Sequence, residues 1–546
     1  MTAENDSRVV IAVWADPDRS PMGLPAKLDR PLRGEPVLRR TIRRLERVEG
    51  AAGIVVFCQP EHEEIIGRLV AGTRAEILKA RFDPPRYWPG VQASRKWAKT
   101  CWRGGLLGAC GFDEEVLPAV LHEVAKASRA EAVLSVPASA VVVDPHLLSR
   151  QIAHYRQYRD EYKLFFTQAP PGLSGVVVAA DLLSQMGQTS QLLGSALVYR
   201  PDAPKPDIIA KPCNIVIDPA VIQTPVRLIG DNKRSLGLIE AMLDELTDEE
   251  LGADRICRWV RDKGLPHLSR WPDEIEAELV AGWPTPKSIR PAPGPRGPID
   301  AGRLIDQIAK LTAECDDLLV CLGGFGEPTR HPRFAEIVQD LHNAGVWGIC
   351  LNTTGLLDEP TADMLVDLPI DIVSVLLDVP DRQRYAQAFG QDCYEDALAG
   401  IERLIRSRHE RRQPLPLVVP EMLKTHETLD LMEPFYDTWL NKVGAAVIAG
   451  YCDYAGQLAD LAVSSMAGPQ RRPCRRLWSR MTVLADGTVP LCDVDFLAAN
   501  PAGNLGDKPL TDLWHNGPLG QLRSDHRSGR YDSNSLCAKC TQWHRP

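Results

Sequence analysis

The feature that most constrains this chain is a set of four cysteines in its C-terminal tail. They are Cys474, Cys492, Cys537 and Cys540. The last two form a Cys-x-x-Cys knuckle, which is one of the loops that hold metals in proteins. Four thiolates suit tetrahedral zinc or an iron–sulfur cluster. The spacing leaves both open, together with the alternative that the cysteines are unliganded core residues.

A predicted β-hairpin carries one of these cysteines. The apolar run 481–485 and the segment 488–491 flank Asp486-Gly487, which is typical of a two-residue hairpin turn because both residues tolerate a positive φ. The second strand ends at Cys492. We therefore expect the hairpin to present one thiolate, and the knuckle two more, to a common metal centre.

Short sequence motifs surround the cysteines in a fixed order. They are Cys474-Arg-Arg-Leu-Trp478, Leu484-Ala-Asp-Gly-Thr-Val-Pro-Leu-Cys492, Gly503-Asn-Leu-Gly506, Leu510-Thr-Asp-Leu-Trp514 and Cys537-Ala-Lys-Cys-Thr-Gln-Trp543. Together they resemble the SPASM domain, which is the C-terminal extension of many radical S-adenosylmethionine (SAM) proteins. The resemblance implies that the four cysteines hold one auxiliary [4Fe–4S] cluster, and it implies no second auxiliary cluster.

Composition and charge exclude several classes of protein. The chain has 546 residues, 44% of them hydrophobic and 25% charged, which suits a globular protein of about three or four domains. Its net charge of −9 gives no general attraction for nucleic acid, so no nucleic-acid partner is expected. There is no apolar run of about 20 residues to span a membrane, and the stretch 9–15 is too short and wrongly flanked for a signal peptide. We therefore expect a cytoplasmic protein.

The N-terminal part has the pattern of a parallel α/β sheet. Two apolar segments, 8–15 and 53–57, are predicted buried strands. Between them, apolar residues at helical spacing mark one face of a helix over 37–45. Strand, helix and strand at this pitch predict a parallel sheet, and we expect this domain to cover residues 1–220.

Loop motifs in this first domain carry a second resemblance. Residues 15–20, Gly23-Leu-Pro-Ala-Lys27 and 32–38 resemble the start of nucleotidyltransferases with a glycosyltransferase-A-like, Rossmann-type fold. The resemblance implies that the loop after the first strand holds nucleotide phosphates and that Lys27 adds positive charge. However, Gly23 stands where the family has an arginine. Ser139 stands where it has a metal-binding aspartate, and serine cannot replace a carboxylate as the main charge partner of Mg²⁺. A domain that binds a ligand or only packs is therefore favoured over transferase activity.

The middle of the chain shows less chemistry. Residues 221–285 are rich in charge and helix formers, with the clearest helix at 236–246, and we interpret them as a helical connector. The stretch 284–298 holds six prolines, each of which removes a backbone donor. It therefore predicts a linker or an irregular loop.

Residues 286–455 repeat a β–α rhythm. The strand candidates are 318–322, 347–351, 370–377, 415–419 and 445–449. Between the first two lies a predicted helix, with Gly345 placed to end it. Such alternation predicts a full or partial (β/α) barrel, followed by the small cysteine-bearing domain at 456–546.

Loops at the predicted barrel mouth carry candidate cofactor-binding residues. Gly323-Gly324-Phe325-Gly326-Glu327-Pro328 follows the first recognised strand, and glycines there permit close backbone approach to a ligand. A plain βα loop is the alternative. The segment resembles the radical SAM GGEP loop, which receives the amino group of SAM. By the same resemblance, Asn352 and Thr354 stand in a Thr-Asn-Gly-like loop, and Ser374 lies on the strand near the SAM ribose.

The defining motif of radical SAM enzymes is absent. That motif, Cys-x3-Cys-x2-Cys, holds a [4Fe–4S] cluster by three irons and leaves the fourth iron open to SAM. Residues 258–314 contain no cysteine, and Cys315 and Cys321 have the wrong spacing. Without three thiolates no iron is left to pass an electron to bound SAM. The resemblance therefore argues for the fold and against the usual reaction.

The whole arrangement resembles the proteins called spiro-SPASM, which share this order of domains. We predict an α/β protein with a nucleotidyltransferase-like domain, a radical-SAM-like barrel and a SPASM domain. The leading hypothesis is a protein that keeps one auxiliary cluster and serves in binding, scaffolding or electron relay, with a peptide or protein as partner. The alternatives are an active radical SAM enzyme with atypical cluster ligands, a nucleotidyltransferase and a zinc-stabilised binding protein. SAM binding and the oligomeric state stay open.

Overall fold

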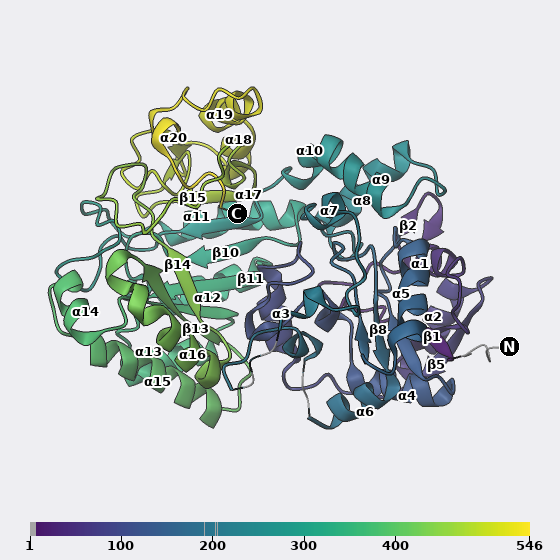
Figure 1. Ribbon diagram of the computed structural model, residues 1–546. Helices are drawn as coiled ribbons and strands as arrows, with labels where there is room; N and C mark the ends of the chain where they lie inside the picture. Colours follow the sequence, from purple (N-terminus) through teal and green to yellow (C-terminus); the bar gives the residue numbers. More distant parts are fainter. Residues whose placement is uncertain (1–6, 190–191, 203, 205, 546) are drawn as a thin grey trace. The chain divides into compact units, whose positions relative to one another are not determined.

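The chain folds around two large sheets, as the computed structural model shows (Figure 1). The structure describes residues 7–545, apart from 190–191, 203 and 205. Backbone contacts divide the chain into two compact units, Met1–Leu268 and Ser269–Pro546. The division falls inside the predicted connector 221–285, so the helices of that connector belong to the N-terminal unit and its last residues to the C-terminal unit.

The N-terminal unit is built on a six-stranded sheet in the order β5-β4-β1-β6-β8-β7. Its strands are β1 (Val9–Trp14), β4 (Ile54–Cys58), β5 (Ala75–Lys79), β6 (Ala132–Ser135), β7 (Leu164–Phe165) and β8 (Val176–Ala179), and β2 (Pro31–Leu32) and β3 (Glu35–Pro36) form a separate small ribbon. β1 pairs in parallel with β4 and β6, whereas β8 is antiparallel to β6 and β7. The predicted parallel start of this domain is therefore confirmed.

α-Helices surround this sheet, and the last of them lead to Leu268. They are α1 (Val37–Leu45), α2 (Glu63–Val70), α3 (Trp88–Lys96), α4 (Pro118–Ala127), α5 (Pro145–Tyr158), α6 (Ala180–Thr189), α7 (Pro219–Ile222), α8 (Lys233–Glu245), α9 (Ala253–Trp259) and α10 (Leu265–Leu268). The predicted apolar face of α1 is buried in the core, and α8 covers most of the helix predicted at 236–246. Helix burial of this kind supplies most of the stability of such short helices.

The C-terminal unit is built on an open sheet of seven parallel strands, in the order β14-β13-β12-β11-β10-β9-β15. The strands are β9 (Glu274–Ala277), β10 (Leu319–Leu322), β11 (Gly348–Thr353), β12 (Ile372–Asp378), β13 (Leu417–Lys424), β14 (Val447–Gly450) and β15 (Arg480–Val483). All five strands predicted for the barrel are present, with their ends shifted by a few residues. Because the order has two ends, β14 and β15, the sheet is open and does not close into a barrel.

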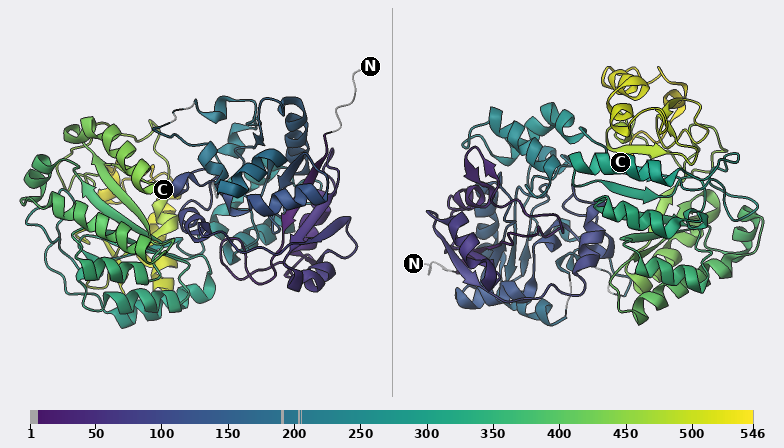
Figure 2. Two further views of the ribbon diagram at one scale, coloured as in Figure 1. Left: turned by 90° about the horizontal axis from the view of Figure 1, so that it is seen from below. Right: turned by 180° about the vertical axis from the view of Figure 1, so that it is seen from behind.

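Helices alternate with these strands, and further short helices follow in the tail (Figure 2). They are α11 (Ala301–Glu314), α12 (Phe334–Asn343), α13 (Glu359–Asp367), α14 (Arg382–Phe389), α15 (Tyr394–Glu410), α16 (Met432–Val443), α17 (Arg476–Ser479), α18 (Leu510–His515), α19 (Gly517–Arg527) and α20 (Ser535–Lys539). α12 ends just before Gly345, as predicted. Within the described part of the chain, no helix has both the length and the hydropathy needed to cross a bilayer.

The two faces of the seven-stranded sheet differ in chemistry. Side chains such as Val320, Ile349 and Val373 are buried in the apolar core of this unit. Successive strand residues point to opposite faces, so Cys321 and Asn352 lie on the other face, which is richer in polar groups. The register places Asn352 beside Ser374 on that face. The polar face is therefore the one that can meet a ligand.

The first strand of this sheet lies where we expected a helical connector. β9 pairs in parallel with β10 on one side and β15 on the other, so it is a central strand. Its sequence, Glu-Ile-Glu-Ala, alternates charged and apolar residues over only four positions, which is too short a pattern to stand out from charged surroundings. The following stretch 284–298 forms neither helix nor strand, as its prolines predict.

The predicted hairpin around Asp486-Gly487 is wrong in its strand pairing. The turn is present, with a φ of 81° at Gly487 and a hydrogen bond of 2.8 Å from its N–H to the carbonyl of Leu484. However, β15 pairs with β9, whereas β16 (Thr488–Pro490) pairs antiparallel with β17 (Pro501–Asn504). The edge of the large sheet buries the apolar side chains of β15 more fully than an isolated two-stranded hairpin can.

Met481→Ala tests how strongly β15 supports the C-terminal unit. Met481 is 3% exposed and lies in register with Ile275 of β9. We expect its truncation to lower the free energy of unfolding of this unit by about 2–5 kcal/mol. Met466 is 65% exposed, so Met466→Ala should change that free energy by no more than about 0.5 kcal/mol. Urea unfolding of the full chain measures both, and equal effects would contradict the role given to β15.

Candidate metal centre and the mouth of the parallel sheet

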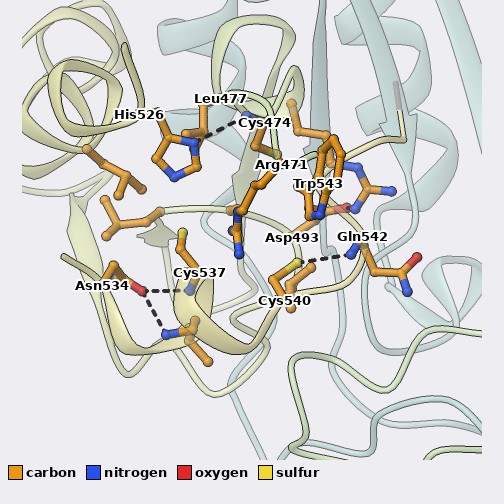
Figure 3. Close-up of a pocket in the computed structure, with 16 residues that line it drawn as sticks. Arg471, Cys474, Leu477, Asp493, His526, Asn534, Cys537, Cys540, Gln542 and Trp543 are labelled. Carbon is orange, nitrogen blue, oxygen red and sulfur yellow. Dashed lines mark hydrogen bonds and ion pairs between the residues drawn. The ribbon is translucent and has the colours of Figure 1, made fainter. Parts of the chain in front are cut away.

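The four tail cysteines line one hollow in the C-terminal unit (Figure 3). Three short elements bring them there from distant parts of the tail. Cys474 comes just before α17, Cys492 follows β16, Cys537 lies in α20 and Cys540 ends it. The other walls are largely apolar and include Leu477, Leu522 and Trp543. The structure thus brings together the four residues that the sequence suggested as metal ligands.

No three of the tail sulfur atoms lie within 4.8 Å of one another in the structure. Four sulfurs at a Zn–S distance of about 2.3 Å would lie about 3.8 Å from one another in a tetrahedron. Among the described residues, such a close group of metal-binding side chains occurs at Asp16, Asp18 and His62 of the N-terminal unit. The tail sulfurs form no group of this kind. The wider spacing suits an iron–sulfur cluster, in which each thiolate binds a different iron.

Burial raises the pKa of all four thiols. It raises the pKa of Cys474 to about 11 and that of Cys537 to about 12. It is also the largest cause of the raised pKa of Cys492 and of Cys540. The thiols of the metal-free protein are therefore neutral near pH 7. A metal must displace their protons when it binds, so binding releases protons.

Polar groups around the hollow could form hydrogen bonds with a bound metal cluster and its thiolate ligands. The amide of Gln542 donates to Sγ of Cys540 at 3.3 Å, which stabilises negative charge on that sulfur. Nε of Arg471, Nε2 of His526 and Oε1 of Gln542 are buried and meet no partner among the residues that the structure describes. Buried polar atoms are usually satisfied. A bound cluster would offer sulfur acceptors to the two nitrogen donors among these groups.

Two side chains position the cysteine backbone. Nδ1 of His526 accepts a hydrogen bond of 3.2 Å from the amide of Cys474, and burial lowers the pKa of His526 to about 4. Oδ1 of Asn534 accepts from the amides of Leu536 and Cys537 at 2.9 and 3.3 Å and so caps α20. The knuckle therefore starts from a capped helix turn and not from a free loop (Figure 3).

An ion-pair chain leads from this hollow to the polar face of the sheet. Asp493, the residue after Cys492, pairs with Arg476 at 2.6 Å and with Arg480 at 3.6 Å. Arg480 lies in β15 and also pairs with Glu274 of β9 at 3.0 Å. The metal site and the polar face are thus joined by alternating charges.

Glu327 ties two loops together at the carboxyl ends of the strands. Its side chain is buried. Oε2 accepts hydrogen bonds from Oγ1 of Thr353 at 3.1 Å and from the amide and Oγ1 of Thr354 at 2.8 and 2.7 Å, while Oε1 accepts from Oγ1 of Thr329 at 2.8 Å. Both carboxylate oxygens are occupied, so Glu327 and Thr354 act together as a clamp between the loops after β10 and β11.

The remaining predicted cofactor residues fall into separate places. The glycine loop, with Gly323, Gly324 and Pro328, lies beside the segment after β9. A Cβ at Gly326 would approach the carbonyl oxygen of Val280 to 2.1 Å, so only glycine fits there. Lys27 lies in the N-terminal unit, where its Nζ donates to the carbonyl oxygens of Pro25 and Asp231 at 3.2 and 3.1 Å.

Asn352 and Ser374 lie side by side on the polar face. Nδ2 of Asn352 donates to Sγ of Cys321 at 3.4 Å. Cys321 in turn lies opposite Cys350 on the neighbouring strand. This group faces the same side of the sheet as the charged residues of β9, and it is spatially separate from the tail hollow, whose lining includes none of these residues.

Arg290, which the sequence reasoning missed, lies in the segment where the Cys-x3-Cys-x2-Cys motif was expected. Its guanidinium binds both oxygens of Asp378, with contacts of 2.7 and 2.9 Å, and also Oε1 of Glu421 at 2.5 Å. Asp378 ends β12 and Glu421 lies in β13. These partners are 88 and 131 residues away along the chain, so no local pattern in the proline-rich stretch could have indicated the pairing.

Arg296 makes a second such anchor six residues later. Its guanidinium pairs with Glu278 at 2.9 Å and also donates to the carbonyl oxygen of Phe496. Glu278 is fully buried just after β9, and it accepts further hydrogen bonds of 3.2 Å from the amides of Phe325 and Ala485. The proline-rich stretch is thus held over the carboxyl ends of the strands by two arginine–carboxylate anchors.

Comparisons with known proteins show which domain family the tail matches. Residues 474–541 match the model of the SPASM family, an iron–sulfur cluster-binding domain. A protein of Treponema pallidum (strain Nichols), described as an uncharacterized protein, is 23% identical over 284 residues, which cover 49% of this chain and 77% of that protein.

Two other similarities cover smaller or more divergent regions. The tungsten-containing aldehyde ferredoxin oxidoreductase cofactor-modifying protein of Pyrococcus furiosus is 31% identical over 110 residues, which cover 20% of this chain and 31% of that protein. The crystal structure of BtrN in complex with AdoMet and 2-DOIA is 18% identical with a TM-score of 0.33, and the match covers 50% of this chain and 93% of that one. The chain thus spans less than a third of the Pyrococcus protein.

Arg290→Met tests the first arginine anchor. The substitution leaves Asp378 and Glu421 without their cation, and we expect it to lower the free energy of unfolding of the C-terminal unit by about 3–5 kcal/mol. Arg384→Met is the matched control because its ion pair with Asp430 is exposed, so its loss should change stability far less. Urea unfolding measures both. A loss for Arg290→Met no larger than for the control would contradict the anchor.

Glu276→Gln tests the electrostatics of the polar face. Burial, opposed by Arg480, raises the pKa of Glu276 from 4.5 to about 7. The folded state therefore holds the proton more tightly than the unfolded state. The stability that this provides is fully present below pH 4.5 and is lost as the pH rises through 7. Glutamine does not titrate, so the wild type should lose about 1–2 kcal/mol relative to Glu276→Gln between pH 4.5 and 8. Urea unfolding of both proteins at pH 4.5 and 8 measures this difference. Equal changes in the free energy of unfolding for the wild type and the variant would contradict the raised pKa of Glu276.

Proposed function

We propose that the chain is a radical SAM/SPASM-type protein that holds one auxiliary [4Fe–4S] cluster in its tail and lacks the cluster that cleaves SAM. One contrast carries the proposal. Four cysteines line a single hollow in the tail, whereas the segment expected to hold the SAM-cleaving cluster contains no cysteine and is held by Arg290 and Arg296. When bound, such a cluster supplies one-electron redox chemistry.

The residues of the chain restrict what the tail site can do. With four thiolates, each iron already has its protein ligand, so none is left open to SAM or a substrate. Leu477, Leu522 and Trp543 keep water away from the hollow, and the ion pairs of Asp493 link it to the polar face of the sheet. These features favour a role in electron relay, binding or scaffolding. A peptide or protein partner stays a prediction.

The N-terminal unit fits a nucleotidyltransferase-like fold without its usual metal chemistry. Its mixed six-stranded α/β sheet supports the fold. Ser139, at the expected metal position, offers no carboxylate, and Lys27 already donates to two backbone carbonyls. The proposed domain limits are 1–220, 221–285, 286–455 and 456–546. SAM binding at the glycine loop is the alternative to a domain that binds no SAM.

Metal content is the decisive measurement. Anaerobic reconstitution with iron and sulfide should yield about four irons per chain and a brown chromophore. Replacing Cys537 and Cys540 together with alanine should abolish both. Cys101→Ser is the matched control, because Cys101 is exposed and lies in the other unit, and it should retain the full iron content. Zinc at about one ion per chain in place of iron would overturn the assignment.

The count of clusters also separates an inactive domain around the seven-stranded sheet from an active radical SAM domain. About eight irons per chain would show a second cluster and contradict the proposal. Incubation of the reconstituted protein with SAM and dithionite should release no 5′-deoxyadenosine. Its release would favour the alternative of an active enzyme with atypical cluster ligands, and it would do so without affecting the assignment of the tail cysteines.

A further inference from the structure

One oxygen of the Glu115 carboxyl group in the N-terminal unit is buried without a hydrogen-bond partner among the described residues. The residue is 5% exposed, and its Oε2 meets no donor in the part of the chain that the structure describes. The preceding residue offers a contrast, because Glu114 pairs with Arg95 at 2.8 Å and with Arg227 at 2.6 Å. A buried and unsatisfied carboxyl group costs free energy, and a hydrogen-bond donor brought by a ligand would offset that cost.

The cations near Glu115 are already engaged by other carboxylates. Arg227 binds Asp231 as well as Glu114, and Arg95 binds Glu114. Burial, and next the charge of Glu114, raise the pKa of Glu115 well above its usual range, while Arg227 partly opposes them and Asp231 adds to them. Without a ligand, the carboxyl group of Glu115 therefore favours its protonated form, and an ammonium group that displaces this proton would pair with the carboxylate.

Glu115 lines a hollow whose other walls suit an organic cation. It is the one lining residue with an ionisable side chain. The aromatic side chains of Trp102 and Phe112 form part of the wall, and Trp102 is held by stacking on Phe166 at 5.4 Å between ring centroids. The guanidinium of Arg103 already lies over the Trp102 ring, 5.9 Å from its centroid, so these rings offer a ligand an apolar wall. The hydroxyl-bearing residues Ser135 and Ser174 add hydrogen-bonding capacity.

We propose that this hollow binds a small organic cation, with a primary ammonium group paired to Glu115 and an apolar portion against Trp102 and Phe112. This ligand class differs from the anionic nucleotide that the resemblance to nucleotidyltransferases implies, because a phosphate here would face a carboxyl group with no counter-ion. A neighbouring hollow shares Glu115 and also contains Lys27 and Asp16, so charges of both signs are available to the rest of a larger ligand. The site is independent of the metal centre.

The first test compares three probes of one shape on the full-length wild-type protein. The probes are n-butylammonium, n-butanol and butyrate. Their binding is measured by saturation-transfer NMR and by the shift in the thermal unfolding midpoint of the protein. We expect n-butylammonium to bind at least about tenfold more tightly than the neutral or the anionic probe, as a desolvated charge pair requires. Absence of n-butylammonium binding would overturn the proposal, and so would equal binding of n-butanol, which would indicate an apolar hollow only.

The second test removes the charge at one atom. Glu115→Gln keeps the shape of the side chain and should weaken n-butylammonium binding by at least about tenfold. Glu123→Gln on α4 is the matched control, since Glu123 is exposed, and it should leave binding unchanged. Unchanged binding to Glu115→Gln would overturn the proposal. If this variant does not fold, the comparison of n-butylammonium with n-butanol on the wild type decides alone.

Discussion

The burial of four thiol groups in one largely apolar hollow is the constraint on which the C-terminal tail depends. Burial keeps the thiols of Cys474 and Cys537 protonated near pH 7, and only a bound metal makes four neighbouring thiolates stable. The elements that carry them, α17, β16 and α20, span three to five residues each, too few to be stable alone. The metal site and the tail fold are therefore expected to form together.

The tail is also built into the large sheet. β15 pairs with β9, and Nε1 of Trp514 donates to the carbonyl of Ser269 at 3.0 Å. Glu278, just after β9, bonds both to Arg296 and to the amide of Ala485 in the tail. Buried ion pairs of this kind contribute little net stability, but breaking one is costly. They consequently define one arrangement of the proline-rich stretch over the strands.

Local patterns allowed much of the fold to be predicted, and they failed where partners are distant. The strands of the C-terminal unit were recognised because each is a short apolar run followed by a helix. β9 was missed because four alternating residues give a weak signal. The hairpin at Asp486-Gly487 was paired wrongly because turn chemistry specifies the turn and not the neighbour that each strand prefers. The cysteines were identified from their spacing, whereas Arg290 and Glu115 depend on contacts that no spacing encodes.

The sequence by itself determined the chemistry that is available: four tail thiols, a glycine loop, and no cysteines where a reactive cluster would need them. These follow from residue identity and short-range spacing. Only the tertiary structure decided that the four sulfurs line one hollow, that Arg290 meets Asp378 and Glu421, and that one carboxylate oxygen of Glu115 is buried without a partner among the described residues. The physical reason is that burial and charge pairing depend on distances in space, and folding brings together groups that lie far apart along the chain.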